Sequence, residues 1–181
     1  YIFVRLSNSL AGQNSINISY LPLNDERFRG QMFRNINRGT ISFSSNTWDA
    51  FSFGGSLEIG RDINRSANPV LGKGYSISGN ATIKPTPRFR LTFNYNYSTL
   101  SEIDGSETFY SGDIYRLNTR YHFTSKWYTR LISEYDSFND EIQLYPLVSY
   151  KANPFTKFYM GVTSYITEFN QSGAGGFRDY R

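Results

Sequence analysis

The chain has 181 residues, a net charge of +4 at neutral pH and no cysteine. This length allows one domain, and the scattered basic residues do not indicate a nucleic-acid partner. The absence of cysteine excludes disulfide bonds, thiolate metal sites and cysteine nucleophiles, and no run approaches the ~18 apolar residues that a membrane-spanning helix needs.

Apolar and polar residues alternate in ten segments along the chain, which is typical of β-strands with one apolar and one polar face. The aromatic share of 18% also favours strands over helices. We expect about ten strands of about 8–11 residues, the length that a tilted membrane strand needs. The alternating segments cover residues 2–6, 15–20, 40–44, 51–60, 75–84, 88–98, 115–123, 127–136, 142–151 and 158–166.

The segment 88–98 shows the alternation most clearly. Its odd-numbered residues are Phe, Leu or Tyr, and its even-numbered residues are Arg, Thr, Asn or Ser. The same pattern recurs in the other segments. It predicts an all-β fold, an antiparallel transmembrane β-barrel or part of a larger one, with residues 1–181 in a single domain. The apolar set expected to face lipid includes Ile77, Leu91, Phe93, Tyr95, Leu117 and Leu131.

The connections between the predicted strands alternate between short and long, which is typical of outer-membrane barrels. Short turns are predicted at 46–50, 85–87, 124–126 and 152–154, and long polar loops at 22–38, 61–73 and 99–112. The connection 137–140 is short and departs from this alternation. We expect the short turns to face the periplasm and the long loops to lie outside the cell.

Aromatic residues gather near the predicted short turns, where rings would settle at a membrane–water boundary. The predicted aromatic girdle consists of Trp48, Phe51, Phe89, Phe123, Trp127 and Phe155. The alternative interpretation is a set of ordinary core aromatics that flank the turns of a soluble sandwich.

The most distinctive sequence motifs lie in residues 79–161, above all Tyr145-Pro146-Leu147 and Asn153-Pro154. This stretch resembles the C-terminal outer-membrane β-barrel domain of bacterial proteins in which the barrel follows a domain similar to family 9 carbohydrate-binding modules. The resemblance implies a location in the outer membrane of a Gram-negative bacterium and no established activity. This chain contains no such module, so no sugar-binding role is carried over.

Both ends of the sequence depart from a complete barrel. Tyr1 already lies in a strand-like run, and no closing strand with an aromatic end follows Phe169; the chain ends in the Gly-rich stretch 171–181, which includes Gly175-Gly176. An open edge in lipid leaves backbone groups unpaired at high cost. We therefore expect an incomplete polypeptide whose strands pair with missing strands of the same protein or with other subunits.

Charged residues on the polar face divide into two groups. The predicted lumen-lining basic residues are Lys84, Arg88, Arg90, Arg116, Arg120, Arg130 and Lys151, most of them near the short turns. Acidic residues gather toward the other end, among them Glu102, Asp104, Glu107 and Glu134. These charges either bias the passage of charged solutes through a lumen or pair across strands and fill a small barrel.

Little in the sequence indicates catalysis or a bound cofactor. His122 is the sole histidine, and we interpret it as a polar lumen residue rather than as the base of a hydrolase. Asp25-Glu26 and 139–141 offer oxygen ligands, but they lack the spacing of a calcium loop. No catalytic residue, metal site or cofactor is predicted.

The sequence therefore predicts a non-enzymatic, porin-like outer-membrane protein whose partner is the lipid bilayer. Its function is that of a passive pore or transport channel, or of a membrane anchor for a larger protein or complex. Two alternatives stay open. One is a soluble β-sandwich binding module, in which the apolar residues form a core. The other is a membrane-embedded hydrolase, against which the single histidine argues.

Overall fold

The computed structural model describes residues 2–167, and each described element is a β-strand. Tyr1 and the predicted features after Phe169, including Gly175-Gly176, lie outside the described residues. The strands are β1 (Ile2–Leu10), β2 (Asn14–Leu23), β3 (Glu26–Phe28), β4 (Gln31–Phe33), β5 (Arg38–Trp48), β6 (Phe51–Asn64), β7 (Val70–Thr86), β8 (Phe89–Glu102), β9 (Thr108–His122), β10 (Trp127–Asp136), β11 (Glu141–Lys151), β12 (Lys157–Gly161) and β13 (Ser164–Thr167).

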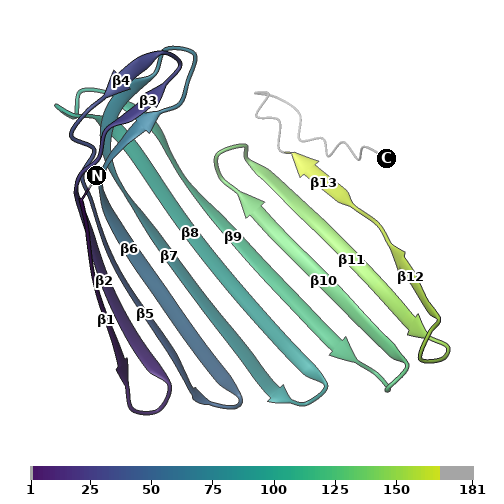
Figure 1. The fold of residues 1–181 in the computed structure, drawn as a ribbon. Coiled ribbons are helices and arrows are strands. Elements are labelled where there is room, and N and C mark those ends of the chain that lie inside the picture. The colour runs from purple at the N-terminus through teal and green to yellow at the C-terminus, as the bar shows by residue number, and fades with distance from the viewer. Residues whose placement is uncertain (1, 168–181) are drawn as a thin grey trace. The chain divides into compact units, whose positions relative to one another are not determined.

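Eleven strands form one sheet in the order β1-β2-β5-β6-β7-β8-β9-β10-β11-β12, with β13 also pairing with β11. The pairings with a defined register are all antiparallel, for example those of β10 with β9 and β11, which lie side by side in Figure 1. The predicted all-β antiparallel architecture is confirmed. Among the described residues β1 and β12 end the strand order and the sheet is not closed, so the barrel stays a prediction.

The strands extend beyond the predicted segments on the side of the long connections. β7 has 17 residues and β9 has 15, so both strands continue into stretches that the sequence indicates as loop. The predicted loop 22–38 also contains the small hairpin of β3 and β4. Its two-residue turn has positive φ at both Arg29 (47°) and Gly30 (82°), as a type I′ turn requires.

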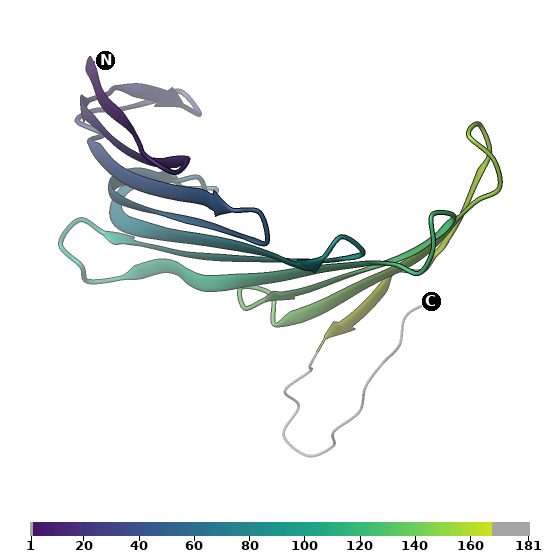
Figure 2. The ribbon, with the colours of Figure 1, turned by 90° about the horizontal axis from the view of Figure 1, so that it is seen from below.

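The short turns are fixed by backbone angles and by local side-chain contacts. In the hairpin of β1 and β2 (dark purple in Figure 2), Gly12 and Gln13 adopt φ values of 73° and 58°. The Thr124 hydroxyl accepts a hydrogen bond from the Trp127 N–H at 3.1 Å, and the Asn153 amide oxygen accepts one from the Thr156 N–H at 2.8 Å. These polar side chains stabilise turns by satisfying backbone donors.

The interruption between β12 and β13 follows from Pro146 on β11. Both short strands keep one register along β11, with Leu147 opposite Gly161 and Leu144 opposite Ser164. The Pro146 carbonyl accepts a hydrogen bond from the Val162 N–H at 3.2 Å. In an antiparallel pair the N–H and C=O of one residue face the same neighbour, and proline supplies no N–H there. Pairing therefore stops at this point.

Contacts divide the chain into two compact units. The first contains residues 2–47, 52–79 and 96–112, and the second contains 48–51, 80–95 and 113–167. In the first unit Phe33, Ile36 and Ile63 form a small buried core, against which Phe28 and Leu71 pack. The buried apolar side chains of the described region are these three and Leu100, so burial covers very little of the alternating apolar face.

Candidate functional site

The apolar face of the second unit is defined by the register of β9, β10 and β11. Leu131 at the middle of β10 stands opposite Thr119 and Pro146, and the next row outward joins Ser133 to Leu117 and Leu144. These apolar side chains are exposed: 41% of Leu131 and 37% of Leu117 are accessible. The first unit shows the same feature, with Ile16 and Ile18 exposed on β2.

Aromatic rings border this apolar face near the short turns. Trp127 contacts the Tyr150 ring at a centroid distance of 4.5 Å, and Phe123 contacts Tyr121 at 4.9 Å. Of the other predicted girdle residues, Trp48 pairs with Phe51 at 6.3 Å, Phe89 pairs with Tyr121 at 6.4 Å, and Phe155 is 98% exposed in the turn before β12. The register thus brings predicted girdle residues into contact with Tyr121 and Tyr150, which the sequence interpretation left out.

A second aromatic row, farther from the short turns on β8, β9 and β10, is absent from the sequence interpretation. Tyr95, Tyr115 and Tyr135 lie on three neighbouring strands, with centroid distances of 5.0 Å and 6.2 Å between successive rings. The Tyr95 hydroxyl donates a hydrogen bond to the Asp113 carboxylate at 2.6 Å. Tyr95 and Tyr115 lie near the middle of β8 and β9, and Tyr135 is next to last on β10. One signal was available: each tyrosine lies on the apolar parity of its strand.

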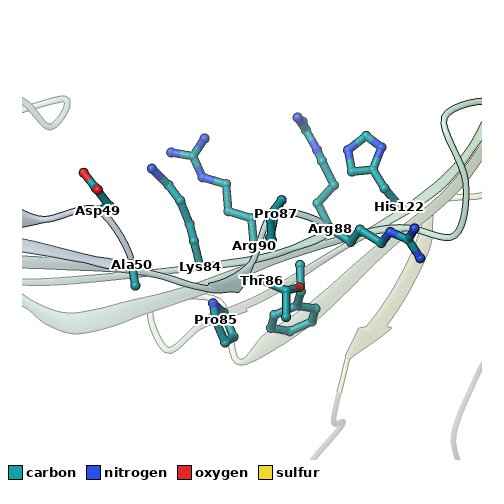
Figure 3. A pocket seen from close by; sticks show the side chains of 11 residues that line it. Asp49, Ala50, Lys84, Pro85, Thr86, Pro87, Arg88, Arg90 and His122 are labelled. Carbon is teal, nitrogen blue, oxygen red and sulfur yellow. The ribbon is translucent and has the colours of Figure 1, made fainter.

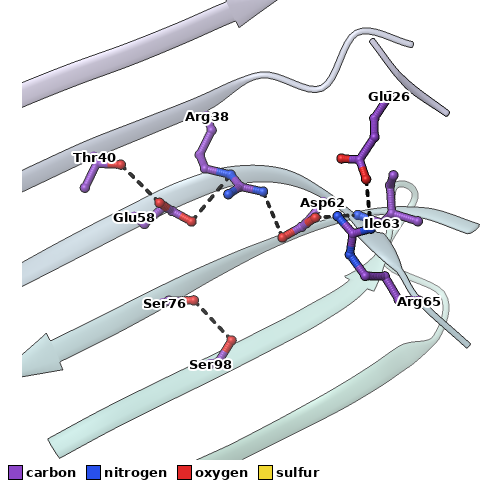
Figure 4. Close-up of polar contacts among 9 residues, drawn as sticks. All are labelled: Glu26, Arg38, Thr40, Glu58, Asp62, Ile63, Arg65, Ser76 and Ser98. Atoms are coloured by element: carbon purple, nitrogen blue, oxygen red, sulfur yellow. Dashed lines mark hydrogen bonds and ion pairs between the residues drawn. The ribbon is translucent and has the colours of Figure 1, made fainter. Parts of the chain in front are cut away.

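Hydroxyl groups line the polar face and bond to one another across strands. The Ser56 and Ser78 hydroxyls are 2.7 Å apart. The Ser76 and Ser98 hydroxyls, which are joined by a dashed line in Figure 4, are 3.1 Å apart. Ser149 on β11 is only 1% exposed. The side chains of the polar face are therefore hydrogen-bonded to one another and more buried than those of the apolar face. In an ordinary soluble sheet the apolar face is the buried one.

The register aligns four of the predicted basic residues in one row, here called the basic row: Lys84, Arg90, Arg120 and Arg130. The pairing of β9 with β10 places Arg120 directly opposite Arg130. The backbone N–H of His122 donates a hydrogen bond to the Arg88 carbonyl at 2.8 Å, so these two residues are opposite each other on β9 and β8. Two residues further from the turn 85–87, Arg90 therefore faces Arg120.

The fourth member of the basic row is Lys84. The hydroxyls of Thr82 and Thr92 form a hydrogen bond at 3.2 Å, which places these two residues opposite each other on β7 and β8. Because β7 and β8 are antiparallel, Lys84 lies opposite Arg90, two residues closer to their shared turn. Neighbouring strands are about 4.8 Å apart, and like charges directly opposite one another are destabilising. The basic row is therefore an electrostatic cost in the absence of a compensating anion.

A cavity of about 540 Å³ opens beside the basic row, and a smaller one of about 220 Å³ lies between β8 and β9. Both are lined by Arg90 and Arg120. Figure 3 shows Asp49, Lys84, Arg90 and His122 rising from one side of the strands into the larger cavity, with Pro85 on the other side.

The predicted basic residues differ in their partners. Arg116 lies on the same strand and face as Arg120 and pairs with Glu134 at 3.4 Å. Arg120 lies over the Tyr128 ring at 5.8 Å, and the buried Nε of Arg130 has no hydrogen-bond partner in the described part of the chain. No ion pair within the described residues involves a member of the basic row. Lys151, opposite Lys157, lies outside the row.

Charges at the long-connection end of the first unit are paired with each other. Arg38 lies between Glu58 at 3.4 Å and Asp62 at 2.8 Å (Figure 4). Arg65 pairs with Glu26 at 2.8 Å, and this hydrogen bond raises the pKa of the Arg65 guanidinium. In the β8–β9 connection the Ser106 N–H bonds to Asp104 at 2.9 Å and lowers the pKa of that carboxyl.

The residues weighed as calcium ligands or as a catalytic base have protein contacts. Asp25 accepts a hydrogen bond from the Asn35 N–H at 3.1 Å, and Asp140 accepts one from the Tyr135 hydroxyl at 3.3 Å. The His122 ring lies 5.3 Å from the Tyr128 ring. Within residues 2–167 no group of three or more His, Asp or Glu side chains could hold a metal ion.

No protein family matches the chain, and no curated protein sequence matches it. The described part of the chain contains no helix that is long and apolar enough to cross a membrane.

Proposed function

We propose that the chain forms part of an antiparallel transmembrane β-barrel in the outer membrane of a Gram-negative bacterium. The observation that carries this proposal is the reversed polarity of the sheet. In the first unit, exposed apolar side chains such as Ile16 stand on one face, while hydroxyl pairs such as Ser56 and Ser78 are satisfied on the other. In the second unit, Leu131 is likewise exposed on the apolar face.

The spacing of the two aromatic rows supports the same proposal. β10 has 10 residues, with Trp127 first and Tyr135 next to last, and a tilted membrane strand needs ~9–11 residues. Aromatic girdles border the apolar band of outer-membrane barrels on both sides. The alternative interpretation is a soluble sandwich, in which a second sheet would cover Leu131 and the rest of the apolar face. A face covered in this way would need no border of aromatic residues.

The proposed role is passive: a pore or transport channel for solutes, or an anchor that holds a larger protein or complex in the membrane. Remaining strands, from the same protein or from other subunits, would complete the barrel. Planar-bilayer recordings separate the two roles, because a pore gives discrete conductance steps and a filled anchor gives none.

Alkaline carbonate extraction of membranes from the source organism tests the membrane assignment. Carbonate releases peripheral proteins, while embedded proteins stay in the membrane pellet. We expect the full-length protein in the pellet of the outer-membrane fraction and its release only by detergent. Quantitative release into the carbonate supernatant would contradict the proposal.

A further inference from the structure

We propose that the basic row binds a small solute carrying two or more oxyanion groups, either phosphates or carboxylates. The inference goes beyond the proposed function, because the row belongs to the polar face whether the apolar face meets lipid or not. The site lies within the second unit, on β7 to β10.

The first argument is charge. Lys84, Arg90, Arg120 and Arg130 stand opposite one another on four successive strands, and guanidinium groups stay protonated at any ordinary pH. Among the described residues that line the larger cavity, Asp49 is the sole carboxylate. Within residues 2–167 no carboxylate forms an ion pair with the row, so its charges are available to an outside partner.

The second argument is the state of the arginines themselves. Arg116, a few residues away on the same face, has its own carboxylate in Glu134. By contrast, Arg130 keeps a buried Nε donor that has no partner within residues 2–167. A buried donor left unpaired costs free energy. Arg130 lines neither cavity, so it would act on a bound anion through its charge beside Arg120.

The third argument is shape. The cavity of about 540 Å³ has the size of a typical small-molecule site, and Arg90 and Arg120 also line the smaller cavity beside it. Thr92 and Asn118 line that smaller cavity and offer further hydrogen-bond donors. Planar guanidinium forks bind phosphate and carboxylate groups in two-point contacts, and lysine adds a point charge. The larger cavity is lined by three members of the row, Lys84, Arg90 and Arg120, and by Arg88. Several cations around one cavity suit an anion with several charged groups better than one with a single group.

Isothermal titration calorimetry on the full-length protein in detergent micelles tests the proposal, at constant ionic strength set with chloride. Pyrophosphate and citrate serve as the two multivalent probes, and orthophosphate and acetate serve as their smaller counterparts. We expect at least one multivalent probe to bind at least tenfold more tightly than its smaller counterpart. Comparing the two probes shows whether the site prefers phosphate or carboxylate groups.

The variants Arg90→Gln and Arg120→Gln are each expected to weaken binding of that probe at least tenfold. Arg120→Lys keeps the charge but loses the fork, so an intermediate loss is expected. The matched control is Arg116→Gln, on the same strand and face, which should change affinity less than threefold.

Thermal unfolding of the probe-free variants checks that they fold, and we expect Arg120→Gln to unfold at or above the temperature of the unmodified protein, because it removes like-charge repulsion. Absence of binding by both probes, or an equal loss in the Arg116→Gln control, would overturn the proposal. This result is independent of carbonate extraction, so the two proposals can fail separately.

Discussion

Arginine in place of Leu131 is expected to destabilise the membrane-embedded protein by about 2–4 kcal/mol, the cost of a charge near the bilayer midplane on the lipid face of a barrel. Leu131 lies midway between Trp127 and Tyr135 on β10, and its side chain is exposed on the apolar face. It is therefore the position at which an added charge would lie deepest in lipid.

Two controls separate the effect of charge from that of lost packing. Leu131→Ala removes the same side chain without adding charge and should cost far less, because lipid fills the space. Ile132→Arg places the charge on the polar face beside Glu134, and a small effect is expected there. Denaturant titration of the protein in lipid vesicles measures all three, and equal costs for arginine at 131 and 132 would refute the assignment of the two faces.

Alanine in place of Gly74 is expected to destabilise the protein by about 3 kcal/mol, because the added methyl group has no space. A Cβ atom at Gly74 on β7 would lie 2.0 Å from the Thr99 carbonyl oxygen on β8. The obstacle is backbone, which cannot rotate away as a side chain can. The two strands would have to separate locally and lose hydrogen bonds.

Gly79→Ala on the same strand is the matched control. A Cβ atom there meets nothing within 4 Å, and the backbone angle at Gly79 is not in the left-handed region. Alanine at this position should leave stability unchanged or raise it by less than about 1 kcal/mol. Similar losses for the two variants in the same denaturant titration would show that the close approach at Gly74 is not limiting.

The positions of the long strands could be predicted because a period of two residues is visible without any knowledge of partners. Their ends could not, since β7 and β9 continue past the turn-forming residues that end the sequence prediction. The hairpin of β3 and β4 was missed because three-residue strands are too short to show alternation. Its turn pair, Arg29-Gly30, was the available signal.

The candidate site was predicted only as a set of residues on one face. Parity places Arg90, Arg120 and Arg130 on the same side, but their alignment depends on strand stagger. The turn 123–126 sets the offset of Arg120 and Arg130. The pairing of Arg90 with Arg120 could not be predicted, because the ends of β8 and β9 lie in the stretch 99–112 that the sequence indicates as a long loop. The row of Tyr95, Tyr115 and Tyr135 escaped prediction for the same reason.

Site-directed spin labelling along β10 tests the central claim, that one face of this sheet meets lipid, most directly. The sequence contains no cysteine, so none has to be removed from it before single cysteines are placed at positions 128–135. In vesicles, we expect accessibility to oxygen to peak at Thr129, Leu131 and Ser133, and accessibility to a water-soluble nickel reagent to peak at Arg130 and at positions 132 and 134. High nickel accessibility at every position, or no two-residue period, would contradict a lipid-facing sheet.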